Sequence, residues 1–274
     1  MTTSIHTNTS AMIALQNLNR SNEQLAATQS RVSTGLKVQG AKDNAAVWAV
    51  AQGQRADKGS LESVTTSLNR ATSLADVSLA AGQQISDLLL ELKAKATAAA
   101  DPSATTATRA SYDQEFQALL GSIDSFADNA TFDGANILDG TSATALDFLA
   151  NADATETISL TRQNLTVAGL SLNGEDLTTQ ANADAALTAV TAAIATASSR
   201  LAELGAEAKQ IERHTTFVSK LSDSLEAGIG NLVDADLAKE SARLQALQVQ
   251  QQLGVQALSI ANQAPQVILS LFQN

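Results

Sequence analysis

The sequence predicts a mainly α-helical protein, a long coiled-coil helical hairpin or bundle formed by its N- and C-terminal halves, with a small β-hairpin region. Apolar residues recur at alternating spacings of three and four along most of the 274 residues, as they do in coiled coils. Only two prolines are present, so long stretches carry no helix breaker. A period of two, which is typical of strands, occurs in one short region.

The N-terminal half contains three expected helices. The first carries a weak stripe, in which asparagine and glutamine interrupt the apolar positions: Ala11, Leu15, Leu18, Asn22, Leu25, Gln29, Val32 and Leu36. A non-helical connector is expected at 33–40. The second helix is stronger and covers 61–99, until Asp101 and Pro102 stop it. A third, shorter helix covers 112–126.

Residues 131–178 break the helical pattern. Asp133-Gly134 and Asn173-Gly174 are turn signals. Between them, 157–161 and 165–167 alternate apolar and polar residues with a period of two. This segment therefore predicts a small β-hairpin region on a helical scaffold.

The C-terminal half holds the clearest helical pattern. Residues 187–232 alternate spacings of three and four without a slip, and Asp184 is placed to cap the start. The last helix has a weaker stripe made of Leu237, Glu240, Leu244, Leu247, Gln251, Gly254, Leu258 and Ala261. Pro265 is expected to interrupt it before Ile268 and Phe272.

The composition excludes several classes of function. With 28 acidic and 17 basic side chains, the net charge of −11 would repel the phosphates of nucleic acid. The chain has no cysteine and only two histidines, His6 and His214, far apart in sequence, which argues against a metal site. No apolar run reaches the 18 residues of a membrane span. Because no motif gathers a nucleophile, a base and oxyanion donors, we expect no catalytic residue, no cofactor and no enzyme.

Charge is distributed unevenly along the chain. Residues 101–190 carry thirteen acidic side chains against Arg109 and Arg162, which indicates a solvated outer surface. Residues 1–19 and 244–274, by contrast, contain no charged side chain. Because chain ends are normally polar and solvated, uncharged ends with apolar residues at helical spacing predict burial against another protein chain.

Three sequence blocks resemble those of bacterial flagellins, the subunits of the flagellar filament. The N-terminal signature of that family is similar to RVSTGLKV at 31–38, followed by AKDNAA at 41–46. Its middle motif is similar to FDGANILDG at 132–140, and its C-terminal motifs to DADLAKES at 234–241 and ANQAPQ at 261–266. Three blocks in the right order are a specific signal, whereas one alone would be weak.

The resemblance implies a domain organisation. Residues 1–40 would pair with 233–274 as an inner terminal coiled-coil domain, and 41–232 would form a helical rod domain carrying the β-hairpin region at about 131–178. No large outer insertion domain is expected, because the segment 131–186 is short. The protein would polymerise into a helical filament used for swimming motility.

The uncharged terminal stripes are the expected self-assembly site. Free monomers would keep their ends loose, and joining the growing filament would order both ends and bury the stripes. The expected self-assembly residues are Leu15, Leu18, Leu25, Val32, Leu244, Leu247, Leu258, Ile268 and Phe272.

The resemblance also implies partners and a location. The partners are other copies of this chain, other flagellins in a mixed filament, the flagellar export apparatus with an export chaperone, and the hook-associated junction and cap proteins; no nucleic acid and no membrane are expected. The chain would reach the extracellular filament without a cleaved signal peptide, because its first 19 residues lack a basic segment followed by an apolar one.

Two other structural readings remain as alternatives. The flagellin-like junction protein between hook and filament belongs to the same class, although the C-terminal ANQAPQ motif favours a flagellin. A signalling coiled coil would share the heptads, but it predicts charged helix faces up to the chain ends and no β region.

Overall fold

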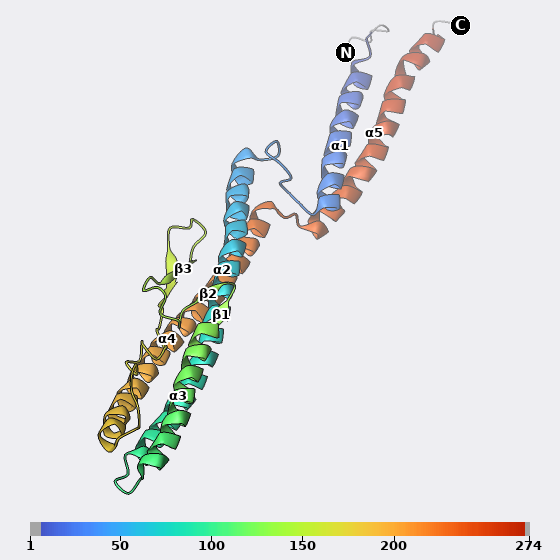
Figure 1. The fold of residues 1–274 in the computed structure, drawn as a ribbon. Coiled ribbons are helices and arrows are strands. Elements are labelled where there is room, and N and C mark those ends of the chain that lie inside the picture. Colours follow the sequence, from blue (N-terminus) through green and yellow to red (C-terminus); the bar gives the residue numbers. More distant parts are fainter. Residues whose placement is uncertain (1–6, 272–274) are drawn as a thin grey trace. The chain divides into compact units, whose positions relative to one another are not determined.

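The computed structural model describes the backbone of residues 7–271 and the side chains of residues 7–263. Within this part the protein is helical, with two short antiparallel hairpins (Figure 1). The helices are α1 (Thr9–Thr34), α2 (Ala45–Ala99), α3 (Thr106–Asn129), α4 (Gln180–Val233) and α5 (Leu237–Leu271). The strands are β1 (Thr131–Phe132), β2 (Ala135–Asn136), β3 (Leu146–Leu149) and β4 (Thr157–Leu160).

The chain forms two compact units. A terminal unit consists of residues 1–56 and 225–274, and a central unit consists of residues 57–224. Both α2 and α4 contribute to each unit, because each helix passes a boundary between the two. The two units are described separately below.

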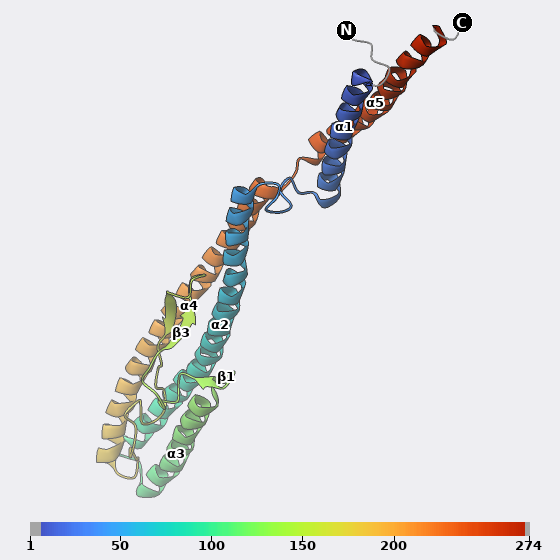
Figure 2. The same ribbon diagram turned by 90° about the horizontal axis from the view of Figure 1, so that it is seen from above.

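The central unit is built on α2, α3 and α4. Both ribbon views show α3 running alongside α2 (Figures 1 and 2). The Arg109 guanidinium ties these two helices together by donating to the carbonyl oxygens of Ala99 (2.8 Å) and Asp101 (2.7 Å). The core is apolar and fully buried, with members from all three helices: Leu68, Ile85, Leu89, Leu92, Phe116, Ile123, Val190, Leu204 and Ile211. The expected helical bundle is therefore confirmed for this unit.

The β-hairpin region packs on the helices of the same unit. Asp133 (φ 50°) and Gly134 (φ 75°) form the turn between β1 and β2, as the two positive φ angles of a type I′ turn require. Strand β4 pairs with β3, with Leu146 opposite Leu160. The hairpin contacts α2 where Ser67 Oγ accepts from the Leu149 N–H (3.1 Å), and α4 where His214 Nε2 lies 2.7 Å from the Ala150 carbonyl oxygen.

One strand prediction was wrong. Residues 165–167 do not pair with 157–160; they form a loop whose Val167 N–H donates to the Asp124 carboxylate (2.7 Å). The partner of β4 is β3 at 146–149, which no sequence signal had selected. A period of two predicts that a strand has one buried face, but not which other segment supplies its hydrogen-bond partners.

Helix boundaries also differ from the prediction. α2 begins at Ala45, where the Asn44 side chain accepts from the Val47 N–H (3.1 Å). α4 begins at Gln180, because Thr179 accepts from the Asn182 N–H through its hydroxyl (3.2 Å), so Asp184 lies inside the helix and does not cap it. α5 continues through Pro265 to Leu271, so that proline removes one backbone donor without ending the helix.

The first half of α4 is rich in alanine. By length and composition alone this helix could cross a membrane, since one 18-residue window has a mean hydropathy of 1.2. A core helix passes the same test, and α4 buries Ala186, Val190 and Ala193 within the central unit at helical spacing. The finding is therefore weak support for a membrane span.

Candidate functional site

The terminal helices α1 and α5 pair in antiparallel orientation. At one end of the pair, the Asn8 amide donates to the Ala261 carbonyl oxygen (2.7 Å). At the other end, Arg31 and Glu240 form an ion pair (3.5 Å). Between them, the Gln251 amide donates to Asn22 Oδ1 (2.8 Å). These contacts join residues that are more than 200 positions apart in the sequence.

The paired face of α1 is formed mainly by small residues. Ser21 and Thr28 are buried, and Ala11, Ala14, Leu18 and Leu25 are half-buried. The predicted stripe was therefore wrong by one position at three places: Ala14, Ser21 and Thr28 lie in the seam, and Leu15, Asn22 and Gln29 are exposed. The predicted stripe and the observed paired face both keep a spacing of three or four. The small side chains of the observed face allow α1 and α5 to approach more closely.

The paired face of α5 follows the predicted stripe from Glu240 onward, whereas Leu237, the first predicted member, is exposed. Its members are Glu240, Leu244, Leu247, Gln251, Gly254, Leu258 and Ala261, of which Leu247 is buried and the others are half-buried. A Cβ atom on Gly254 would lie 3.2 Å from Leu18 Cδ1, so the absence of a side chain there lets the helices come close. We call the contact between these two faces the seam. It is thin in the sense that it buries little apolar surface, because few large apolar side chains fill it.

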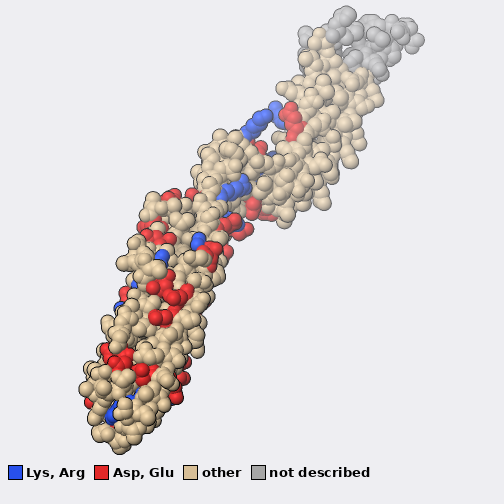
Figure 3. Space-filling model, in the orientation of Figure 1, with Lys and Arg blue, Asp and Glu red and all other residues tan. Residues whose placement is uncertain are grey.

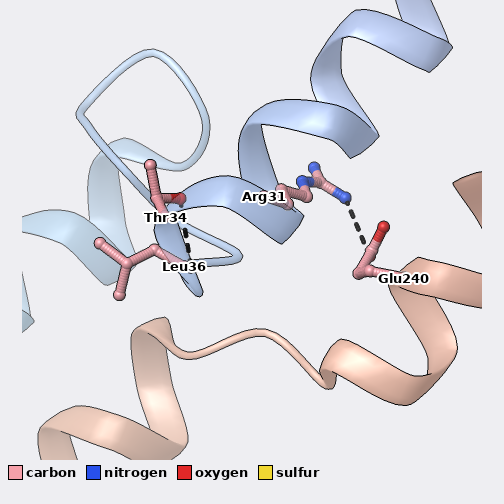
Figure 4. A network of polar contacts seen from close by, with 4 residues as sticks. All are labelled: Arg31, Thr34, Leu36 and Glu240. Carbon is pink, nitrogen blue, oxygen red and sulfur yellow. Dashed lines mark hydrogen bonds and ion pairs between the residues drawn. The ribbon is translucent and has the colours of Figure 1, made fainter.

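The end of the pair near the connector is polar (Figure 4). Arg31 lies in the last turn of α1 and Glu240 in the first turn of α5, and each charge is favourable at its helix end. The Glu240 side chain is 12% exposed, and its Oε2 atom is buried without a hydrogen-bond partner in the described part of the chain. Arg31 is therefore the main compensation for this carboxylate.

The connector between helices is held by backbone pairing inside the terminal unit. Gly35 adopts φ 72° after the last turn of α1, and Leu36 forms an antiparallel bridge with Asp234. The Lys37 N–H donates to the Val233 carbonyl oxygen (2.7 Å). Beside this bridge, the buried cluster of Val38, Ala51, Ile229 and Val233 packs against Trp48 and other partly buried apolar residues.

A second set of apolar residues on the pair remains exposed. On α1, Met12 is 63% and Leu15 47% exposed. On α5, Val249, Leu253 and Ile260 are each more than half exposed and recur at helical spacing. Figure 3 shows that the visible surface over α1 and α5 is almost free of charged side chains. No other segment among the residues that the structure describes covers these apolar faces, and exposed apolar surface of this kind is typical of contact surfaces.

The structure divides the expected self-assembly residues into three groups. Leu18, Leu25, Val32, Leu244, Leu247 and Leu258 lie half-buried or buried on the paired faces. Leu15 is exposed on the outer face of α1. Ile268 and Phe272 lie outside the residues whose side chains the structure describes. The exposed residues Met12, Val249, Leu253 and Ile260 were not selected from the sequence, although 249, 253 and 260 form a second stripe beside the predicted one.

The described part of the chain gathers no group of three or more His, Asp or Glu side chains that could hold a metal ion. An arrangement of thin helix pairing, uncharged ends and uncovered apolar faces is that of a structural protein that associates with other chains.

Comparison with known proteins identifies the family. The family model for the bacterial flagellin N-terminal helical region matches residues 5–143, and the one for the C-terminal helical region matches residues 187–272. Flagellin FljM of Caulobacter vibrioides is 51% identical over 271 residues, covering 98% of each chain. A flagellin of Brucella melitensis is 38% identical, covering 98% of this chain and 99% of its own. The chain therefore belongs to the bacterial flagellin family.

Solved structures share the fold. Bacillus cereus flagellin matches with a TM-score of 0.50 and 24% identity over 54% of this chain and 86% of its own. A putative flagellar hook-associated protein from Vibrio parahaemolyticus matches with a TM-score of 0.58 and 13% identity over 70% of this chain and 100% of its own. At these identities the likeness concerns the fold alone.

The family defines the function. The chain is a structural flagellin, a subunit of the flagellar filament that serves motility, and it is not an enzyme. Its full-length relatives are named flagellins, so nothing supports the alternative of a hook–filament junction protein.

Proposed function

We propose that the α1–α5 pair is the polymerisation element of this flagellin, and that its exposed apolar faces contact neighbouring subunits. The observation that carries the proposal is the uncovered stripe of Val249, Leu253 and Ile260 on α5, next to ends without charge. Burying such side chains gains about 1.5–3 kcal/mol each. Leu15 and Met12 supply the matching apolar surface on α1.

The paired faces play a different part in this proposal. Leu18, Leu25, Val32, Leu244, Leu247 and Leu258 act within the subunit, where they align α1 with α5. Ile268 and Phe272 extend the same role to the chain end. Because ordering a residue costs about 1–2 kcal/mol of backbone entropy, so thin a seam leaves the pair marginal in the free monomer. Contacts with neighbouring subunits then complete its folding.

The domain roles follow from this division. Residues 1–40 with 233–274 form the inner coiled-coil domain, and 41–232 form the helical rod, with the β region at about 131–178 and no large outer insertion domain. The acidic surplus of 101–190 supports an outward, solvated position for that part of the rod. Heterologous contacts between copies do not close, so they generate a helical polymer.

The remaining partners belong to export and capping. The chain passes through the flagellar export apparatus with an export chaperone, leaves the cell without a cleaved signal peptide, and meets the hook-associated junction and cap proteins in the filament. The uncharged, apolar ends support a need for a chaperone before assembly, because exposed apolar helices associate non-specifically.

Deletion of 244–274 tests the proposal. The shortened chain should keep most of the helicity of the central unit, as measured by circular dichroism, and should form no filaments when seeds and ammonium sulfate are added. A second variant replaces 244–274 by a scrambled segment of the same composition. It changes only the spacing of the apolar residues and should also form no filaments. Normal filaments from either chain would show that the stripes on α5 do not drive polymerisation.

A finer variant separates the two faces. Leu253→Gln changes the exposed face, so it should leave α1–α5 pairing intact and raise the critical concentration for polymerisation about tenfold, the equivalent of about 1.4 kcal/mol. Gln252→Asn, at an exposed position one residue away, is the control and should have no effect.

A further inference from the structure

The loop just before α4 runs between two anchors, Leu172 and Leu177, which are both fully buried in the central unit. The Leu177 N–H donates to the Asp113 carboxylate (2.9 Å). The Glu175 carbonyl oxygen accepts from the Gln117 amide (2.9 Å). Both hydrogen bonds tie the loop to α3, so the main chain between the two anchors has to keep a fixed length.

The tip of this loop is a turn made by Asn173 and Gly174. Both residues are exposed, and Gly174 adopts φ 78°, as the third residue of a type II turn does. One long hydrogen bond closes the turn, from the Glu175 N–H to the Leu172 carbonyl oxygen (3.4 Å). In the part of the chain that the structure describes, neither the Asn173 side chain nor the Gly174 N–H forms a hydrogen bond. A Cβ atom on Gly174 would meet no atom within 4 Å, so the peptide bond between the two residues is open to water.

An asparagine followed by a glycine is open to attack on its side-chain amide by the next backbone nitrogen. Asparagine is a thermolabile residue, and glycine has no Cβ, so the Gly174 nitrogen can approach Asn173 Cγ without steric hindrance. The sequence contains this dipeptide once, at 173–174. The peptide group has to rotate to bring the nitrogen onto Cγ, and the 3.4 Å hydrogen bond that closes the turn restrains this rotation only weakly.

The two aspartate–glycine pairs of the same region are held in other ways. The Asp133 carboxylate forms an ion pair with Arg70 (2.9 Å). The Asp139 carboxylate accepts from the N–H (3.1 Å) and the hydroxyl (3.0 Å) of Thr141. A carboxylate is also a poor electrophile, because it carries negative charge. Asn173, with a neutral amide and no hydrogen bond to hold it, is therefore the reactive side chain of the three.

We propose that Asn173 is a site of spontaneous modification, at which a cyclic imide forms and opens to a mixture of aspartate and isoaspartate. The Gly174 nitrogen loses its proton to a solvent base and bonds to Asn173 Cγ. The bond from Cγ to Nδ2 breaks, and the amide leaves as ammonia with a proton returned by the solvent. Water then opens the imide: attack at the former side-chain carbonyl gives aspartate, and attack at the backbone carbonyl gives isoaspartate. The reaction needs only water and a base, so it does not depend on polymerisation through α1 and α5.

The isoaspartate form lengthens the loop. Its main chain runs through Cβ and Cγ, which adds one atom between two anchors that are fixed, so the Glu175 carbonyl oxygen moves away from the Gln117 amide. The next residue, Asp176, organises the start of α4, because its carboxylate accepts from the Thr178 N–H (2.9 Å) and the Asn182 amide (2.9 Å). We therefore expect the first turn of α4 to loosen in converted subunits, and the converted fraction to increase with the age of a subunit.

Peptide mapping of the folded, full-length chain tests the reaction. After long incubation at mildly alkaline pH, the tryptic peptide 163–200 should gain about 1 Da at Asn173, because OH replaces NH2. An isoaspartyl methyltransferase should label part of this product, since it methylates isoaspartate and not aspartate. Asn164 and Asn182 lie in the same peptide as internal controls; their side chains are hydrogen-bonded, and they should convert at least about tenfold more slowly. Conversion at Asn173 that is no faster than at these two positions would overturn the proposal.

Two variants separate the effect of the longer main chain from that of the added charge. Asn173→Gln keeps an amide but would have to close a larger ring, so it should not convert. Asn173→Asp, used fresh, adds the charge without lengthening the loop. Amide hydrogen exchange in the first turn of α4 should be faster in incubated unmodified chains, and unchanged in incubated Asn173→Gln and in fresh Asn173→Asp. Equally fast exchange in fresh Asn173→Asp would overturn the role of isoaspartate, and unchanged exchange in chains that contain isoaspartate would overturn the loosening of α4.

Discussion

The α1–α5 pair and the central unit follow the same three-four spacing, yet they bury different residues. The central unit buries Leu68, Leu89 and Phe116 completely. The pair buries Ser21, Thr28 and Leu247, and leaves its other leucines half-buried or exposed. The central unit has a fully buried apolar core, whereas the pair keeps most of its apolar residues partly or fully exposed. The comparison shows that a shared spacing does not imply a shared source of stability.

The largest expected loss of stability comes from removing a side chain from the core of the central unit. Phe116→Ala should lower the free energy of unfolding of the central unit by about 3–5 kcal/mol, because it leaves a cavity among fully buried side chains. Leu25→Ala, in the thin seam, should cost the monomer roughly 1 kcal/mol or less. Urea unfolding followed by circular dichroism measures both, and equal losses would remove the distinction between the two regions.

Much of this distinction could be read from the sequence, but the faces of α1 could not. Leu15 and Ala14 both fit a three-four spacing, and the prediction took Leu15, which is exposed, in place of Ala14. The choice depends on how closely α5 approaches, which Gly254 permits and which only the partner helix determines. On α5, where the heptad carries Leu244, Leu247 and Leu258, the prediction was correct except for its first residue, Leu237, which is exposed.

The β region shows the same limit of local patterns. The turn at Asp133-Gly134 was found because its chemistry is local. Strand β3 was missed, because its pairing with β4 depends on Ser67 of α2 and His214 of α4, which lie far away in the sequence. The ends of the helices were set by the caps Asn44 and Thr179, which the apolar pattern does not report.

A smaller effect is expected at the polar end of the pair. Arg31→Ala should destabilise the α1–α5 pair by about 1–2 kcal/mol, because it leaves the poorly exposed Glu240 carboxylate without its counter-charge. Amide hydrogen exchange along α1 should then speed up, while exchange in the central unit stays the same. Adding Glu240→Gln to Arg31→Ala should recover part of the loss, and no recovery would show that Arg31 acts through packing alone.

The smallest effect is a dependence on acid, and it belongs to the central unit. The backbone N–H and hydroxyl of Ser103 lower the pKa of Asp101, and the Thr178 hydroxyl with the Asn182 amide lowers the pKa of Asp176. A carboxylate with a lowered pKa stabilises the fold above its ordinary pKa of 3.8 and loses that contribution as the pH falls towards the lower folded value.

Thermal unfolding at pH 6 and pH 3 measures this dependence. The melting temperature of the central unit should fall in acid, and Asp101→Asn with Asp176→Asn should make the fall slightly smaller. Asp101 is exposed and Asp176 is only half-buried, so the difference should be slight. An unchanged pH profile in the double variant would show that these turns do not depend on ionised carboxylates.

The hydrogen bond between Gln251 and Asn22 joins residues separated by 229 positions. Closing a loop of that length in an unfolded chain costs on the order of 5 kcal/mol in entropy, more than so thin a seam returns. Once the bridge of Leu36 with Asp234 and the cluster around Ala51 and Ile229 have formed, the remaining loop is about 31 residues, 14 from Asn22 to Leu36 and 17 from Asp234 to Gln251. We therefore expect α1 to pair with α5 after this bridge has formed, and only in a chain that contains its C-terminal helix. If the pair is the polymerisation element, as proposed, truncated molecules lack the surface from which the filament grows.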